Sequence, residues 1–360
     1  MCNHLICNFL PETANKATAV AGYTALIYLL RKRHDEFLET TPYPKNAAEC
    51  HQFTSRYIYS DFNFIAVKSL EFGLFKTYAI PSISKILYST RELVDRVGRR
   101  YDDTDLLIRE FLEHEPTAPR AKAAIDRMNY IHSQYKISNE DYLYVLSVFI
   151  VEPIRWVERY GFRNPHDKER YAMHLRWQII GEKMGIRDIP ESYAETERYL
   201  DAFEEKNMVY AESNVIVGNS TTALFLSILP VTLRPFCKPA IYALCPSRLR
   251  QAMGFPNPPR LLVMIIDTAL KLAAFFVRYF MPPRSVPKYR TSRHPVTLSC
   301  NTLLYPCFNP FNKTYEEGYR IAELGPESLC PMKVRCHNEE ENELKPWQLL
   351  PASSQVLLKL

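Results

Sequence analysis

Residues 99–158 read RRYDDTDLLIREFLEHEPTAPRAKAAIDRMNYIHSQYKISNEDYLYVLSVFIVEPIRWVE, and this stretch indicates the fold. Its apolar residues recur every three or four positions, which is the spacing of helices with one buried face. Ser138 and Asp141 form a capping pattern that starts a helix, and Pro153 is expected to kink or end that helix. Similar periodicity continues through residues 46–281 with few strand-like alternations. The sequence therefore predicts an all-α fold.

The composition is that of a folded globular protein. The 360 residues are 47% hydrophobic and 24% charged, which is enough to bury a large core. The 45 basic and 40 acidic residues are interleaved, so no basic block favours nucleic-acid binding. We expect a single large helical domain over residues 46–281, followed by an irregular covering segment over residues 282–360 that is rich in Pro, Tyr and Asn.

Several common functional classes lack support in the sequence. The nine cysteines are scattered without a repeated C-x-x-C spacing, so neither a disulfide scaffold nor a zinc finger is expected. No G-x-S-x-G, P-loop, G-x-G-x-x-G or H-E-x-x-H motif is present. A haem-thiolate enzyme would need a glycine-rich cysteine loop, which the chain also lacks. Any haem must therefore find another axial ligand.

The N-terminal 33 residues contain one apolar run. Residues 17–30 read ATAVAGYTALIYLL, which is 14 uncharged residues between Lys16 and the basic residues 31–33. A membrane span normally needs about 20 apolar residues. We predict a short uncleaved anchor that leaves the rest of the chain in the cytosol. The alternatives are a cleaved signal peptide and an ordinary helix docked on the domain. Residues 260–280 are predicted to form a buried or membrane-facing amphipathic helix.

Three residues suggest a site. Arg100 and Thr104 are four positions apart and share one face of a predicted helix. His132 follows Ile125 and Met128 at helical spacing, so its imidazole emerges from an apolar stripe. Burial favours the neutral imidazole, whose free lone pair can bind a haem iron. The pattern by itself favours a satisfied core histidine at position 132, and a surface arginine beside a helix-start threonine at positions 100 and 104.

A longer set of residues resembles a known family, the MpaB and rubber oxygenase family, and in particular its MpaB-type branch. The likeness extends from Asp61 to about Arg278, and the order and spacing of its pieces make it specific. The residues that carry it are Leu70–Ser84, Arg100, Tyr101, Asp103, Thr104, Asn129, His132, Tyr135, Asn139–Asp141, Leu143, Tyr144, Glu152, Pro153, Trp177, Gly181, Gly185 and Ile186.

The resemblance implies an all-helical fold around haem b, with His132 as the proximal iron ligand. It implies that Arg100 and Thr104 line the haem pocket, where a guanidinium can bind a propionate and a hydroxyl can donate to oxygen or hold a water. It also implies a membrane-anchored oxidoreductase of the endoplasmic reticulum. Two departures exist: rubber oxygenases have a glutamate where residues 84–87 lack a carboxylate, and a distal lysine where this chain has Asp103.

These features lead to one principal hypothesis and two alternatives. The principal hypothesis is a haem oxygenase of secondary metabolism that uses molecular oxygen on a lipophilic isoprenoid or terpenoid-bearing product, with cleavage of a side-chain double bond. The first alternative is a haem oxidase that desaturates or cyclises without breaking a carbon-carbon bond. The second is a non-catalytic helical protein that binds lipid or a partner at the membrane.

Overall fold

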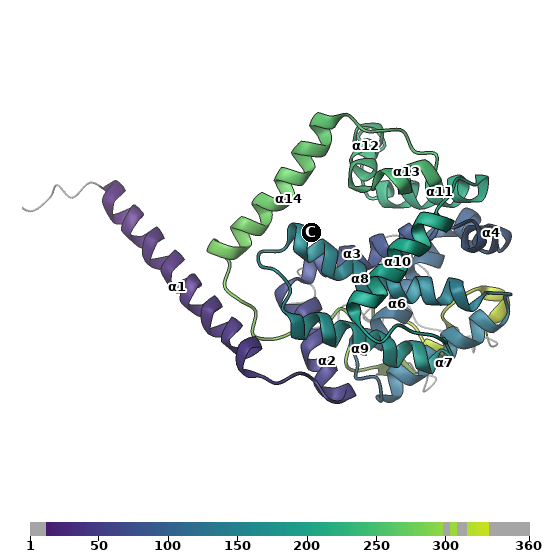
Figure 1. Cartoon of the computed structure of the whole chain (residues 1–360), viewed down its shortest axis with the longest axis horizontal. Coiled ribbons are helices and arrows are strands. Elements are labelled where there is room, and N and C mark those ends of the chain that lie inside the picture. The colour runs from purple at the N-terminus through teal and green to yellow at the C-terminus, as the bar shows by residue number, and fades with distance from the viewer. Residues whose placement is uncertain (1–11, 298–302, 308–314, 331–360) are drawn as a thin grey trace, which may run out of the picture.

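The computed structural model describes residues 12–297, 303–307 and 315–330, and this part of the chain is mostly helical (Figure 1). The α-helices are α1 (Glu12–Thr40), α2 (Ala47–Arg56), α3 (Asn63–Thr77), α4 (Pro81–Ser89), α5 (Glu92–Asp95), α6 (Val97–Leu112), α7 (Pro119–Ser133), α8 (Asn139–Tyr160), α9 (Asp167–Lys183), α10 (Tyr193–Asn207), α11 (Glu212–Ser227), α12 (Arg234–Leu244), α13 (Ser247–Ala252) and α14 (Arg260–Phe280). A π-helical turn, Tyr57–Asp61, joins α2 to α3. The all-α prediction is confirmed.

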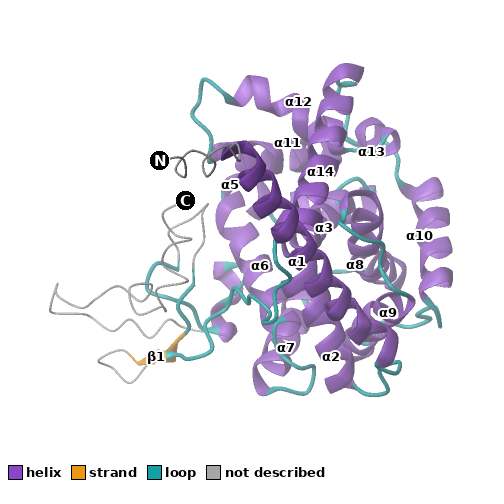
Figure 2. Ribbon diagram, turned by 90° about the vertical axis from the view of Figure 1, so that its left-hand side faces the viewer, coloured by secondary structure: helices purple, strands orange, loops and turns teal. Residues whose placement is uncertain are grey.

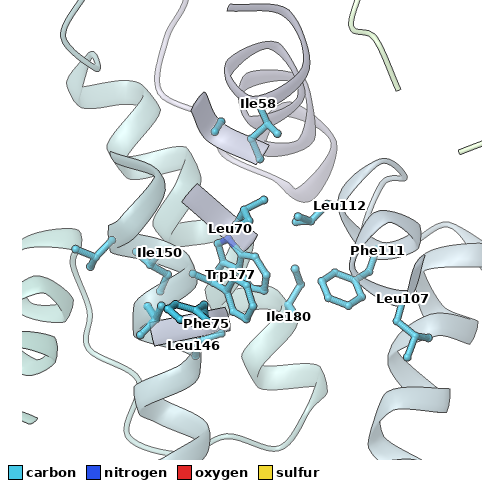
Figure 3. Close-up of a cluster of buried hydrophobic side chains, with 14 of the residues drawn as sticks. Ile58, Leu70, Phe75, Leu107, Phe111, Leu112, Leu146, Ile150, Trp177 and Ile180 are labelled. Carbon is cyan, nitrogen blue, oxygen red and sulfur yellow. The ribbon is translucent and has the colours of Figure 1, made fainter. Parts of the chain in front are cut away.

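The central helix is α8, which packs against α3, α9 and α10. Gly73 of α3 permits close approach, because a Cβ atom there would lie 3.0 Å from a methyl of Val148. Phe149 stacks on Trp177 of α9, with ring centroids 4.6 Å apart. Figure 3 shows Trp177 within the buried cluster, with Phe75 and Ile150 close by. Each large apolar side chain buried here stabilises the fold by about 1.5–3 kcal/mol.

The ends of α8 and α9 follow local rules in part. Ser138 caps α8 by accepting a hydrogen bond from the Asp141 N–H (3.1 Å), as the sequence predicts. Of the two outcomes expected at Pro153, a kink or a stop, the stop does not occur, because the helix continues to Tyr160. Pro153 removes one backbone donor, but its segment is buried in the core, and packing holds the helix together.

Asn164 followed by Pro165 is a common pattern at the start of a helix, but α9 begins two residues later than that pattern predicts. His166 is its N-cap and accepts from the Lys168 N–H, while the Glu169 carboxylate accepts from the His166 N–H at 2.7 Å. This reciprocal cap satisfies the free donors of the first turn, so it overrides the proline signal. Gly185 follows the helix with φ +73°, the left-handed conformation in which glycine commonly ends a helix.

The described part of the segment after α14 is largely irregular. It contains two short antiparallel strands, β1 (Val296–Thr297) and β2 (Leu303–Leu304), and two 3₁₀ turns, η2 (Ile321–Glu323) and η3 (Glu327–Leu329). Figure 2 shows β1 beside the helical body. Residues 298–302, 308–314 and 331–360 of this segment lie outside the described residues, as do residues 1–11 of the N-terminal segment. Where it is described, the segment covers α6 and α7: Tyr319 donates to Glu110, and Arg127 Nε donates to the Leu324 carbonyl at 2.8 Å.

The expected N-terminal anchor is not supported. In the part of the chain that the structure describes, no helix is long and apolar enough to cross a bilayer. The 14-residue apolar run lies in the first part of α1 and spans about 21 Å at 1.5 Å per residue, short of the roughly 30 Å of a hydrocarbon core. Arg31 donates to the backbone carbonyls of Val277 (2.5 Å) and Met281 (2.7 Å) at the end of α14. The C-terminal part of α1 is therefore docked on the fold, which matches the alternative of an ordinary docked helix.

Candidate active site

A cavity with a volume of about 1360 Å³, which includes solvent at its mouth, lies among α4, α6, α7, α8 and α9. Its wall is mostly aliphatic and aromatic. Leu107, Phe111, Leu146 and Trp177 of the cluster in Figure 3 form part of this wall, so the cavity is continuous with the core. The three residues singled out from the sequence, Arg100, Thr104 and His132, all line it.

Arg100 and Thr104 project from α6 one turn apart, as their spacing predicts. The Thr104 hydroxyl donates to the Arg100 carbonyl at 2.9 Å and accepts from the Arg100 guanidinium. Within the described residues, no carboxylate forms an ion pair with Arg100, whereas the adjacent Arg99 pairs with Glu327. Arg100 therefore keeps guanidinium donors that are free to bind an anionic group in the cavity.

His132 lies near the end of α7 and contributes an imidazole without a protein partner. Its Nδ1 is buried, and no described residue forms a hydrogen bond with either ring nitrogen. A buried polar atom left unsatisfied typically costs about 1–3 kcal/mol, so such an atom indicates an absent partner. Burial, with a smaller contribution from the Arg100 charge, lowers the pKa of His132 to about 4. The imidazole is therefore neutral at neutral pH and has a lone pair for a metal.

Two carboxylates on the cavity wall already have partners. Asp103 accepts from the Tyr315 hydroxyl of the C-terminal segment, and burial raises the pKa of this carboxyl despite that hydrogen bond. Asp141 accepts from the Ser82 hydroxyl at 2.6 Å and the Ser138 hydroxyl at 2.8 Å. Both carboxylates are therefore engaged in hydrogen bonds and are not free to act as a base.

The C-terminal segment completes the cavity wall through Gly325 and Pro326. Gly325 has φ +110°, and a Cβ atom there would lie 2.5 Å from Ile131 Cδ1, so only glycine fits this close approach. Sequence reasoning missed both residues and Tyr315. The one available signal was the expectation that this segment covers the helical domain.

A second hollow of about 640 Å³ adjoins the first. Leu74, Thr104 and Ile108 line both hollows. Its polar side contains Asp105, which is ion-paired with Arg109 and, at 3.1 Å, with Arg290. Thr104 is therefore the polar side chain common to the two spaces.

The fold and cavity describe a helical enzyme with a buried, largely apolar reaction chamber. Residues 87–283, which include the three site residues, match the family model described as "ER-bound oxygenase mpaB/B'/Rubber oxygenase, catalytic domain". The chain belongs to this family and is an oxygenase, an oxidoreductase that takes a small-molecule substrate and oxygen. The non-catalytic alternative is set aside.

Three fungal relatives are similar to the chain over much of its length. An ER-bound oxygenase mpaB' of Penicillium brevicompactum is 30% identical over 289 residues, which are 73% of this chain and 68% of the relative. An ER-bound oxygenase mpaB of Penicillium roqueforti (strain FM164) is 32% identical over 211 residues, 54% of this chain and 71% of the relative. The mpaB of Penicillium brevicompactum is 28% identical over 289 residues, 73% of this chain and 67% of the relative.

Proposed function

We propose that the chain is a haem b-dependent oxygenase that acts on a lipophilic isoprenoid or terpenoid-bearing small molecule of secondary metabolism. The observation that carries the proposal is the buried, unpartnered Nδ1 atom of the half-buried His132 side chain, in an apolar cavity that also contains the unpaired guanidinium of Arg100. An apolar macrocycle whose iron binds one imidazole and whose propionates are anionic would be complementary to that arrangement.

The ligands present fit a porphyrin better than an iron held by protein groups alone. Among residues 12–297, 303–307 and 315–330, no three His, Cys, Asp or Glu side chains are grouped so that they could hold a metal ion. One histidine is sufficient when a porphyrin supplies four further nitrogen ligands. The aromatic wall formed by Phe111, Phe149 and Trp177 suits the flat face of such a ring.

Each residue then has a defined task. His132 would hold the iron, and Arg100 would bind a propionate through paired charge-assisted hydrogen bonds. Thr104 would donate a hydrogen bond toward oxygen or hold a water. When bound, the haem supplies oxygen activation and electron transfer, which no side chain of this site can perform. The apolar wall would exclude bulk water and orient the substrate.

The adjoining hollow supports a lipophilic substrate. Most of its wall is apolar, and it meets the larger cavity at Thr104. Oxidative cleavage of a side-chain double bond and oxidation without carbon-carbon cleavage both suit this geometry. Product mass separates the two, because cleavage yields two shorter carbonyl fragments and desaturation removes only two hydrogens. The relatives are named ER-bound, which supports the proposal that the protein acts at the endoplasmic reticulum. We further propose that its catalytic domain faces the cytosol.

The experiment that tests the cofactor compares His132 with a second histidine of the helical domain. We expect purified His132→Ala to lose the Soret band or to bind haem weakly. The matched control is His174→Gln, because His174 is buried but bonds the Pro190 carbonyl at 2.8 Å and does not line the cavity. Circular dichroism checks that both variants fold. A full, spectroscopically unchanged haem in His132→Ala would refute the assignment.

A second experiment tests the face of α6. We expect Arg100→Ala and Thr104→Ala to fold but to lose most of the oxidation of isoprenoid compounds, followed by oxygen uptake and product mass. Arg91→Ala serves as the control, because Arg91 is exposed and pairs only with Asp95 in the described residues (3.0 Å). Near-normal turnover in both cavity variants would show that this face has no catalytic part.

A further inference from the structure

The helix α14 is apolar but has no buried residue. Sixteen of its 21 residues are apolar. Leu261, Met264 and Leu272 are 68%, 65% and 61% exposed. A 21-residue helix is about 30 Å long. The apolar area exposed along this length is far larger than the area that an isolated surface leucine exposes on an ordinary soluble protein. This surface requires a partner.

The exposed residues form one stripe along α14. They recur at intervals of three, four or seven, which places them on a single helical face. The members of this stripe are Leu261, Met264, Ile265, Leu272, Phe275, Phe276 and Tyr279. The charged residues 260, 267, 271 and 278 recur at intervals of seven, four and seven and follow one flank of the stripe. A continuous apolar stripe with a charged flank is the pattern of a helix that lies in the plane of a membrane surface.

The charge of this region favours an anionic surface. Residues 228–290 contain ten Lys and Arg residues and one acidic residue, Asp267, although the whole chain has a net charge of only +5. Asp267 is paired with Lys271 (2.7 Å) and Arg159 (2.9 Å). Arg260 and Arg284, at the two ends of α14, are exposed and have no carboxylate partner within the described residues.

Neighbouring segments extend the apolar surface. Helix α12 contacts α14, and Phe236 near its start is 79% exposed. At the other end of α14, the Tyr23 hydroxyl of α1 donates to the Phe280 carbonyl at 2.9 Å. Leu26 and Leu29 of α1 are exposed as well. Figures 1 and 2 both show α1 and α14 together on one side of the helical body.

We propose that α14 docks the protein in the plane of an anionic phospholipid bilayer, with the apolar stripe in the acyl region and the basic flank at the phosphates. This inference does not depend on the haem proposal. A transverse orientation does not fit, because Asp267 and Lys271 would lie near the bilayer centre. The basic excess favours lipid phosphates over a second copy of this chain, whose equivalent surface has the same charge.

The test is flotation of the full-length protein with vesicles of phosphatidylcholine, with or without phosphatidylserine. We expect binding to the phosphatidylserine vesicles, and roughly a hundredfold weaker binding for Leu272→Ser/Phe275→Ser/Phe276→Ser, because three exposed anchors are removed. Arg260→Gln/Arg284→Gln should bind about 25-fold more weakly and lose most of the preference for phosphatidylserine, at roughly fivefold for each charge.

The control is Tyr43→Ser/Tyr171→Ser, which removes two exposed aromatic residues near α2 and α9 and should bind like the unmodified protein. Unchanged binding of the α14 triple variant would overturn the proposal. A second result would also overturn it: the unmodified protein does not bind vesicles but forms dimers, and the triple variant does not form them. The stripe would then be a protein interface. Soret absorbance is read in parallel, so a failure of the haem proposal is seen separately from a failure of membrane docking.

Discussion

Asp102→Asn should stabilise the protein, although it replaces an acidic residue beside the site. Asp102 lies on α6 between Arg100 and Thr104, is almost completely buried, and has no hydrogen-bond partner for either carboxylate oxygen among the described residues. Burial, and then the negative charge of Asp105, raises the pKa of Asp102 to about 8. The carboxyl group is therefore protonated in the folded protein at neutral pH.

The size of the effect follows from proton linkage. The unfolded chain releases this proton above its ordinary pKa of 3.8, whereas the folded protein keeps it up to about pH 8. The folded state therefore loses stability as pH rises through this window, at 1.36 kcal/mol per unit. At pH 7 the cost is about 4 kcal/mol, and at pH 5 it is about 1.6 kcal/mol. Asparagine has no proton to release, so the cost disappears.

Urea denaturation at pH 5 and pH 7 measures this difference. The gain in free energy of unfolding should be larger at pH 7 by about 2–3 kcal/mol. Asp105→Asn is the opposing control: burial raises the pKa of Asp105, but Arg109 and Arg290 more than offset this and lower it. That substitution leaves the buried Arg109 unpaired and should cost about 3–5 kcal/mol. A gain for Asp102→Asn that does not change with pH, or a loss at pH 7, would refute the reasoning.

Two further substitutions test the core that supports the site. Lys76→Met should lower the free energy of unfolding, measured by urea denaturation, by about 3–5 kcal/mol, because Lys76 neutralises Glu152 (2.6 Å) and Glu204 (2.7 Å) in the interior. Adding Glu152→Gln and Glu204→Gln should restore much of that stability. If stability does not recover, the loss is not a charge effect. Gly181→Ala should cost about 1–3 kcal/mol in a thermal melt, because its Cβ would lie 2.7 Å from Leu146 Cδ2 on the cavity wall; an unchanged melting temperature would show that the wall yields freely.

Local features of the helices could be predicted from sequence, and their assembly could not. Helical periodicity placed Arg100 and Thr104 on one face of α6, and apolar spacing placed His132 on a largely buried stripe of α7. Neither pattern says that the two helices face the same cavity, because that depends on packing between distant segments. The family resemblance alone predicted this meeting, and the cavity contains all three residues.

The places where the structure differs from the sequence-based expectations have local causes. Pro153 does not end α8, because core packing outweighs one missing donor, and α9 does not begin at Pro165, because the His166 cap is stronger. Gly325 and Pro326 could not be assigned to the site, since an irregular segment has no periodicity that shows which surface it covers. The length of the apolar run in α1 did not distinguish a membrane anchor from a helix docked on the domain.

Because Gly325 and Pro326 lie late in the chain, their part of the cavity wall is synthesised after the helices that form the rest of it. The ribosome completes α4 through α9, and therefore the helical walls of the cavity, some 140 residues before it adds this last wall. During that interval the nascent chamber is open on the side of α7 where Ile131 later meets Gly325. In the folded protein Arg127 Nε donates to the Leu324 carbonyl and holds this wall in place, so a ligand of the finished protein enters through the solvent-facing mouth of the cavity.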